Sequence, residues 1–270
     1  ESAAGSRILK GYNPLFNATV IEKVIKEGGI IIGKTSQDEF GFGSFSVNVG
    51  VGFKVPKNPI DKERSCGGSS GGAAGLARKA SFPHIALGES TGGSIAAPAS
   101  FCDVFGLCPT YGRNSRYGLL DYGNSLDKIG TIGKTCYEAA LLQEVIAGHD
   151  SNDSTSLNAM AEDYTKFVGE SAKGIKIGII KEAFGEGNDK SVEKHVNEGI
   201  DRLKDEGVEF EEISLNLPIK YGLAAYYMIA TSEASTNLAK YCGMRYGISD
   251  KLEGNFNEYF TKVISANFVD

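Results

Sequence analysis

Apolar residues recur at helical spacing near the start of the chain. Over residues 18–27, one face collects Val20, Ile21, Val24 and Ile25, and two glycines follow, which is a common way for a helix to end. The sequence therefore predicts an amphipathic helix over 18–27. Residues 30–32 are three consecutive isoleucines, a β-branched run that predicts a short buried strand.

The next elements alternate in the same way. Small residues predict a helix over 71–80, and an apolar run predicts a strand over 84–87. Residues 136–147 predict an amphipathic helix whose inward face is Leu141, Leu142, Val145 and Ile146. The polar stretch 149–157 predicts a loop and the most natural seam in the chain.

Beyond that loop the pattern becomes more regular. Strands are predicted over 175–180 and 208–215, and helices over 189–205 and 219–241. The helix over 189–205 carries an apolar stripe of Val192, Val196, Ile200 and Leu203. Strands that alternate with helices predict an α/β fold, with helices covering the faces of a sheet.

Composition and charge exclude several classes of protein. The chain has 270 residues, and no apolar run approaches the ~18 residues of a membrane-spanning helix. Its 28 basic and 34 acidic residues give a net charge of −6, which argues against a protein that mainly grips nucleic-acid phosphates. The five cysteines form no C-x-x-C pair and the three histidines lie far apart, so neither a metal site nor a disulfide framework is expected.

Glycine is the informative excess. The chain has 35 glycines, nearly twice the usual ~7%, and they concentrate before residue 150. Glycine lets the backbone approach a ligand closely or adopt positive φ angles. We therefore expect the chemistry in the first half of the chain.

One short motif matches the phosphate loop of nucleotide-binding proteins by letter only. Residues 28–35 read GGIIIGKT, but an amphipathic helix precedes them and the isoleucines favour an extended backbone. ATP or GTP binding is therefore not expected there. Lys34 follows apolar neighbours instead, and burial of a lysine favours its neutral, basic form.

Two Gly/Ser segments supply the other candidate groups. Residues 67–72 read GGSSGG and run straight into a predicted helix, unlike a flexible linker, and residues 88–94 read GESTGGS. A serine after two glycines has backbone N–H groups near its own hydroxyl, as an oxyanion hole requires. A nucleophilic serine also needs a base, and Lys34 is a better candidate than any of the isolated histidines.

In this order, the segment GKTSQDEF at 33–40, GGSSGG at 67–72 and STGGS at 90–94 resemble the amidase signature family. Residues 110–133, 139–155 and 226–247 are in addition similar to the GatA branch of that family, which supplies the amidase component of aspartyl/glutamyl-tRNA amidotransferases. The resemblance implies a mixed β-sheet covered by helices on both faces.

The resemblance also implies roles for individual residues. Ser94 matches the nucleophile, Ser69 the cis-serine that relays the proton, and Lys34 the base; Thr91, Gly92 and Gly93 match the oxyanion-hole segment. Residues in the neighbourhood of the family's substrate pocket are Ser70, Tyr226 and Tyr227. Asp38, Arg113, Arg116 and Asp127 are interpreted as structural or interface polar groups.

The function implied by the resemblance is hydrolysis of glutamine, with the ammonia passed on to amidate Glu-tRNA(Gln) or Asp-tRNA(Asn). The chemistry of this component itself needs no cofactor, and ATP and Mg²⁺ would belong to the partner. The implied partners are the amidotransferase B subunit (GatB), the small C subunit (GatC) and, through them, misacylated tRNA. The expected location is the cytoplasm, with an organellar matrix as the alternative.

Two departures from the family pattern keep other functions open. The family usually has aspartate where Ser90 stands and arginine where Ala96 stands. A stand-alone amidase acting on another small amide, or a catalytically inactive scaffold in the same assembly, are therefore the alternatives. We expect residues 1–270 to be one amidase signature domain truncated at both ends, with its catalytic part over about 28–118.

Overall fold

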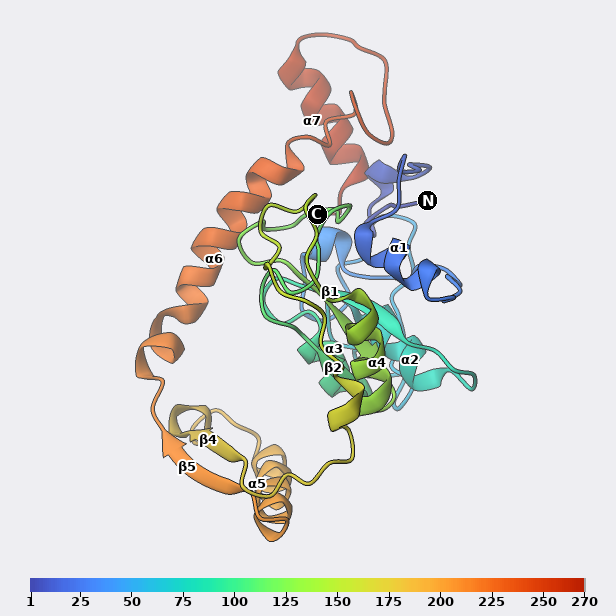
Figure 1. Cartoon of the computed structure of the whole chain (residues 1–270). Helices are drawn as coiled ribbons and strands as arrows, with labels where there is room; N and C mark the ends of the chain where they lie inside the picture. Colours follow the sequence, from blue (N-terminus) through green and yellow to red (C-terminus); the bar gives the residue numbers. More distant parts are fainter. Residues whose placement is uncertain (270) are drawn as a thin grey trace. The chain divides into compact units, whose positions relative to one another are not determined.

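The computed structural model describes residues 1–269, and the chain divides into two units. The first unit comprises residues 1–165 and the residues from 229 onward, and the second comprises residues 166–228. Figure 1 follows the elements along the chain. The boundary falls after Thr165 rather than in the predicted seam at 149–157. That polar loop is tied to the first unit, because the Asp150 carboxylate accepts hydrogen bonds from the Ser115 and Thr19 hydroxyls.

An antiparallel sheet lies at the centre of the first unit. Its strands are β1 (Ala86–Ser90), β2 (Phe105–Leu107) and β3 (Lys128–Gly133), in the order β1-β3-β2. Strand β1 confirms the predicted strand with its start shifted by two residues, whereas β2 and β3 escaped the pattern analysis. Side chains alternate along β3, so Ile129 and Ile132 face opposite sides of the sheet.

Helices cover both faces of this sheet. On one side, Ile132 packs with Ile95 and with the alanines of α2 (Gly71–Lys79), beside α3 (Ala96–Cys102). On the other side, Ile129 packs with Val20 of α1 (Thr19–Lys26) and Ile146 of α4 (Cys136–Ile146). The predicted α/β class is confirmed, and so are the helices predicted at 18–27, 71–80 and 136–147.

A third apolar cluster joins segments that are far apart in sequence. It contains Ile8 and Leu9 from the 3-10 turn η1 (Arg7–Leu9), Phe40 from η2 (Glu39–Gly41), and residues after α6. Those later residues are Tyr241 and, on α7 (Phe256–Asn267), Tyr259 and Val263. The pattern analysis did not anticipate α7.

The second unit has a parallel pair of strands, β4 (Lys176–Ile180) and β5 (Glu209–Ile213), connected by α5 (Lys190–Asp205). It also holds the short turn η4 (Lys181–Ala183), most of η3 (Thr165–Phe167) and the start of α6 (Asn216–Leu238). All four elements predicted beyond residue 175 are present. Parallel and antiparallel pairing therefore both occur, in two separate sheets.

One local prediction was wrong, and a second was wrong at one residue. Residues 30–32 are neither a strand nor buried: their exposed fractions are 86%, 47% and 59%, and no strand of the described chain pairs with them. In α4, Ile146 is buried and Leu142 and Val145 pack against the same cluster, as predicted. Leu141 is exposed instead, and Gln143 is buried. The buried Gln143 amide is satisfied, because it exchanges two hydrogen bonds with the Asn114 amide.

Among the described residues, no helix is both long and apolar enough to cross a membrane.

Candidate active site

The serine pair of the first Gly/Ser segment stands at the entrance to α2. The peptide bond between Gly68 and Ser69 is cis, and Ser69 is only 3% exposed. Its carbonyl accepts hydrogen bonds from the Asp38 N–H, at 3.2 Å, and from the Ser46 hydroxyl, at 3.3 Å. A Cβ on Gly68 would lie 2.2 Å from Asp38 Oδ2, so only glycine fits there.

The carboxylate of Asp38 explains how this loop is held. It accepts backbone hydrogen bonds from Ser46 N–H and Asn48 N–H, both at 2.9 Å. Burial raises the pKa of Asp38, while these N–H donors oppose the rise by favouring the ionised form. Asp38 therefore holds the loop 46–48 against Ser69, which is a structural role as expected from the sequence.

Ser70 connects the two serine segments. Its N–H donates to the Ser94 carbonyl at 3.2 Å. Its hydroxyl donates to the Glu89 carbonyl at 3.1 Å and accepts from the Glu89 N–H at 3.3 Å. Ser70 is thus committed to the protein, which favours a positioning role over the predicted contact with substrate.

The hydroxyls of the two other serines remain available. Ser94 lies between β1 and α3 and is 8% exposed. Within residues 1–269, neither Ser69 Oγ nor Ser94 Oγ makes a hydrogen bond in the structure. The structure therefore brings Ser69, Ser70 and Ser94 together on one wall of the first unit, with two hydroxyls free to react.

The predicted oxyanion segment follows β1 directly. Ala97 N–H donates to the Gly93 carbonyl at 2.8 Å, which fixes the segment to the start of α3. In the part of the chain that is described, the N–H groups of Gly92 and Gly93 donate to no other protein group. Uncommitted backbone N–H groups beside a serine are what stabilisation of an oxyanion requires.

The Thr91 side chain is held by two carboxyl groups. Its hydroxyl lies 3.0 Å from Glu89 Oε1 and 2.8 Å from Asp127 Oδ1. Asp127 also accepts from the N–H groups of Tyr122 and Gly123 at 2.8–3.0 Å. Burial raises the pKa of Glu89 to about 8, and the nearby Asp127 carboxylate adds to the rise.

Sequence reasoning missed Glu89 as a member of the site. Asp127 is 36 positions from Thr91, and only the β1–β3 register, with Ser90 opposite Lys128, brings these side chains together. The available signal was a glutamate that follows the apolar run 85–87 and Gly88 and lies inside the strand, since a carboxyl group placed there must find a partner.

Lys34 lies elsewhere in this structure. Its ammonium donates to the Glu1 carbonyl at 2.7 Å and to the Ser2 hydroxyl. It lines a hollow of about 620 Å³ together with Glu1, residues 3–5, its neighbours within 31–37 and Phe53. Partial desolvation lowers the pKa of Lys34, and the Glu1 carboxylate opposes that change. No hydrogen bond joins Lys34 to Ser69 or Ser94 within the described residues.

Tyr226 and Tyr227 lie on the part of α6 that belongs to the second unit. Their rings meet edge to face with centroids 5.4 Å apart. Their predicted place in the substrate pocket stays a prediction.

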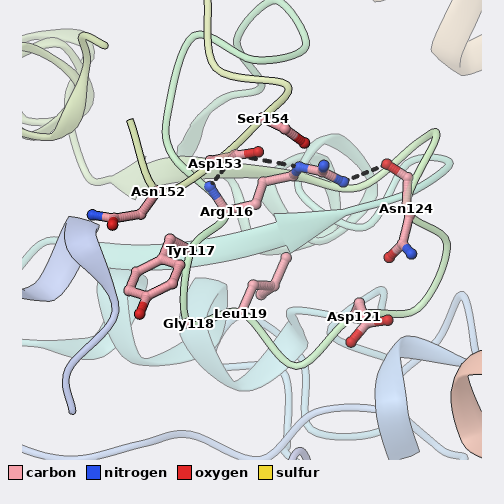
Figure 2. A pocket seen from close by; sticks show the side chains of 9 residues that line it. All are labelled: Arg116, Tyr117, Gly118, Leu119, Asp121, Asn124, Asn152, Asp153 and Ser154. Atoms are coloured by element: carbon pink, nitrogen blue, oxygen red, sulfur yellow. Dashed lines mark hydrogen bonds and ion pairs between the residues drawn. The ribbon is translucent and has the colours of Figure 1, made fainter. Parts of the chain in front are cut away.

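A second hollow, of about 350 Å³, lies around Arg116 (Figure 2). The Arg116 guanidinium donates to the Asn124 carbonyl and, at 2.8 Å, to the Thr155 hydroxyl, and its Nε lies 3.7 Å from Asp153 Oδ2. These contacts give Arg116 the structural role expected from the sequence. The hollow contains none of the predicted catalytic residues.

No group of three or more histidine, cysteine or acidic side chains suited to a metal ion occurs among the described residues.

Comparison with known proteins places this geometry in context. The family model described as Amidase matches residues 1–270. The A subunit of glutamyl-tRNA(Gln) amidotransferase from Microcystis aeruginosa is 48% identical over 267 residues, which are 99% of this chain and 54% of that protein. The Clostridium botulinum protein of the same name is 46% identical over the whole chain and 55% of its own length.

Solved structures agree. The crystal structure of the glutamyl-tRNA(Gln) amidotransferase A subunit from Thermotoga maritima superposes with a TM-score of 0.81 at 37% identity, covering 98% of this chain and 55% of that one. The peptide amidase from Stenotrophomonas maltophilia, at 22% identity and a TM-score of 0.77 over 98% of this chain and 61% of that one, shares the fold. The chain thus spans about half the length of the curated relatives it matches.

Proposed function

Because the chain belongs to the amidase family, we propose that it carries the glutamine-hydrolysing chemistry of the GatA component of a tRNA-dependent amidotransferase. The geometry at Ser94 is the main support: Ser69, after its cis peptide, lies on the same wall as Ser94 through the Ser70 link, beside uncommitted N–H groups. The relatives named as the A subunit of glutamyl-tRNA(Gln) amidotransferase support this branch of the family over others.

In the proposed reaction, Ser94 Oγ attacks the side-chain amide carbon of glutamine. Its proton passes to Ser69, whose own proton passes to a neutral Lys34. The carbonyl oxygen becomes a tetrahedral oxyanion, stabilised by the backbone N–H groups of the segment 91–93. The tetrahedral carbon then expels ammonia, which takes the proton back through the relay. Water finally hydrolyses the glutamyl ester and restores the Ser94 hydroxyl.

For this relay, the Lys34 side chain must leave its hydrogen-bond partners, the Glu1 carbonyl and the Ser2 hydroxyl, and contact the Ser69 hydroxyl instead. Residues 30–34 are exposed and pair with no strand of the described chain, and the Lys34 ammonium is held in its present position by hydrogen bonds to Glu1 and Ser2. In its present position, partial desolvation lowers the pKa of Lys34, and the Glu1 carboxylate opposes that change. Only a neutral lysine beside Ser69 serves as the base, so the placement of Lys34 is tested separately by the Lys34→Ala variant.

The remaining parts of the proposal follow from the family branch. The glutamine-hydrolysing steps use no cofactor, whereas ATP and Mg²⁺ act on the partner GatB, which amidates Glu-tRNA(Gln) or Asp-tRNA(Asn) with the released ammonia. The small GatC completes the assembly. The proposed location is the cytoplasm or an organellar matrix, where such tRNAs are made.

A stand-alone amidase is the second candidate, favoured by the residues beside the nucleophile. Ser90 and Ala96 stand where the family usually has aspartate and arginine, and Ala96 is exposed at the first turn of α3. A change of charge at this position alters the substrates that the site attracts. An inactive scaffold is the third candidate, and the same two positions support it.

The decisive experiment measures ammonia release from glutamine by the full-length protein, alone and with its partners and misacylated tRNA. Ser94→Ala and Lys34→Ala are tested in parallel. Turnover that both variants lose by about 10³-fold or more, and that the partners and tRNA stimulate, supports the proposal. Turnover of simple amides without glutamine supports the stand-alone amidase. An intact assembly without any turnover supports the scaffold.

A further inference from the structure

The Thr91 hydroxyl lies between the carboxyl groups of Glu89 and Asp127, and it cannot donate a hydrogen bond to both if both are ionised. The Thr91 hydroxyl has a single hydrogen, yet it lies within hydrogen-bonding distance of both Glu89 Oε1 and Asp127 Oδ1. That hydrogen can point at only one of the two oxygens, and Glu89 and Asp127 also make a side-chain hydrogen bond to each other, so one of the two carboxyl groups carries a proton. The backbone shows which one is ionised: Asp127 accepts from Tyr122 N–H and Gly123 N–H, as a carboxylate does.

We propose that Glu89 is a positioning residue for the oxyanion segment: its protonated carboxyl donates to the Thr91 hydroxyl, which donates in turn to the Asp127 carboxylate. This chain of hydrogen bonds connects β1 to the residue preceding β3 and holds the first residue of the segment 91–93 in place. Glu89 itself touches no reacting atom in this assignment.

The surroundings favour a neutral Glu89. Its Oε2 faces the backbone of Gly41, where an added Cβ would lie 3.2 Å away, with Ser69 Oγ 3.7 Å from the same point. The charged groups that influence the pair are Lys128, which favours ionisation of Glu89, and Arg116, which favours ionisation of Asp127. The Lys128 ammonium donates to the Leu126 carbonyl, and no ion pair joins Lys128 to Glu89 in the described chain.

The assignment predicts an upper limit of pH for the reaction of Ser94. Since burial and Asp127 raise the pKa of Glu89 to about 8, the carboxyl is protonated at pH 7 and loses its proton as the pH rises through about 8. Two carboxylates then compete for the single Thr91 hydrogen and repel each other. The segment 91–93 loses its fixed geometry, and the reaction of Ser94 slows.

The inference about catalysis rests on the proposed function, so the test has two independent arms. The first arm follows the rate at which a fluorophosphonate, a general reagent for activated serines, labels Ser94 between pH 6 and pH 10. The second arm follows the ¹⁵N amide shifts of residues 91–93 over the same range, which requires no reaction. The wild type is compared with Glu89→Gln, whose neutral amide still donates to Thr91, and with Thr91→Val, which removes the link.

For the wild type we expect the labelling rate to fall about tenfold per pH unit above about pH 8, with amide shifts at the same midpoint. Glu89→Gln keeps the rate within about threefold at pH 7 and loses both the alkaline fall and the shifts. Thr91→Val labels slowly at every pH. Glu39→Gln is the matched control: Glu39 is also a buried carboxyl, bonded to Ser6, and its substitution leaves the alkaline fall in place.

Each outcome decides one question. Amide shifts that disappear in Glu89→Gln support the positioning role even if Ser94 fails to react, in which case the proposed function fails alone. Amides that show no transition near pH 8, or a Glu89→Gln variant that keeps the alkaline fall, overturn the role of Glu89 whatever Ser94 does. Circular dichroism of each variant checks that it is folded, and an unfolded Thr91→Val leaves the Glu89→Gln comparison to decide.

Discussion

The loops around Ser69 and the second unit are stabilised by different interactions. Around Ser69, short loops pack so tightly that a Cβ on Gly68 would overlap Asp38, and buried polar groups such as Asp38 and Asp127 are hydrogen-bonded. In the second unit, α5 has a clear apolar stripe, yet none of its described residues is buried, and Val192 is 61% exposed.

The comparison separates two sources of structure. The elements of the second unit follow from local patterning: helical periodicity, an Asp189 cap and a β-α-β order. The wall around Ser69 has little regular secondary structure and depends on hydrogen bonds between residues distant in sequence, such as Ser70 with Ser94. Substitutions should therefore affect the two regions very differently.

The largest effect is expected at the nucleophile. Ser94→Ala should abolish labelling by a fluorophosphonate, with a loss of about 10³-fold or more, because Ser94 combines a free hydroxyl with the neighbouring uncommitted N–H groups of Gly92 and Gly93. Mass spectrometry of the labelled protein measures this. Ser100→Ala, an exposed serine on α3, is the control and should label as the wild type does. Equal labelling of both variants would show that another residue reacts.

Core packing in the first unit gives the next largest effect. Ile146→Ala removes a side chain with no exposure from the cluster with Val20 and Ile129, and should lower the free energy of unfolding by about 2–5 kcal/mol. Val192→Ala on α5 should change it by less than about 0.5 kcal/mol, because Val192 is mostly exposed. Urea titrations measure both. Similar losses from the two substitutions would mean that the α5 stripe is buried in solution.

A pH-dependent effect of about 2 kcal/mol is expected at Asp150. Burial alone would raise its pKa, but hydrogen bonds from Ser115, Thr19 and Asn152 outweigh burial and lower the pKa of Asp150 to about 2. Since the folded-state pKa lies below the unfolded one, this stabilisation is present above about pH 4 and is lost as the pH falls toward 2. Stability of the wild type should drop across this window, and Asp150→Asn should flatten that drop. Thermal melts from pH 5 to pH 2 measure the difference.

The smallest effect is expected at a helix cap of the second unit. The Asp189 carboxylate accepts from the N–H groups of Ser191 and Val192 at the start of α5. Asp189→Ala should destabilise this helix by about 1 kcal/mol. Hydrogen exchange of the α5 amides detects the change, and the amides of β3 serve as an internal reference. Faster exchange in β3 as well would contradict the local origin of the effect.

Sequence patterns predicted the regular elements well and their burial less well. The helices α1, α4 and α5 follow from periodicity, α2 follows from a run of small residues, and the helix predicted at 219–241 covers much of α6. None of these patterns says what covers a face. Residues 30–32 show this limit: three isoleucines favour a buried strand, yet a strand needs a partner, and none of the described residues provides one. Gln143 shows the opposite case, a polar residue that is buried. Its amide is satisfied by two hydrogen bonds with the Asn114 amide.

The candidate site could be predicted in part because its motifs are local. Ser69, Ser70 and Ser94 lie in two short Gly/Ser segments, and the structure brings these segments together. The Thr91 partners could not be predicted, because the register of β1 against β3 is a tertiary property. The position of Lys34 depends on competing hydrogen bonds to Glu1 and Ser2, which no motif encodes.

The apolar cluster that joins the two ends of the first unit has a consequence for synthesis on the ribosome. Ile8 and Leu9 are fully buried, but their partners Tyr241, Tyr259 and Val263 are translated more than 230 positions later. At about 5–20 residues per second, the cluster around these early side chains therefore stays incomplete for roughly 12–50 seconds, although Phe40 is made early. During that interval the nascent chain exposes apolar surface that a chaperone can bind, whereas β4, α5 and β5 pair as soon as about 40 consecutive residues have emerged.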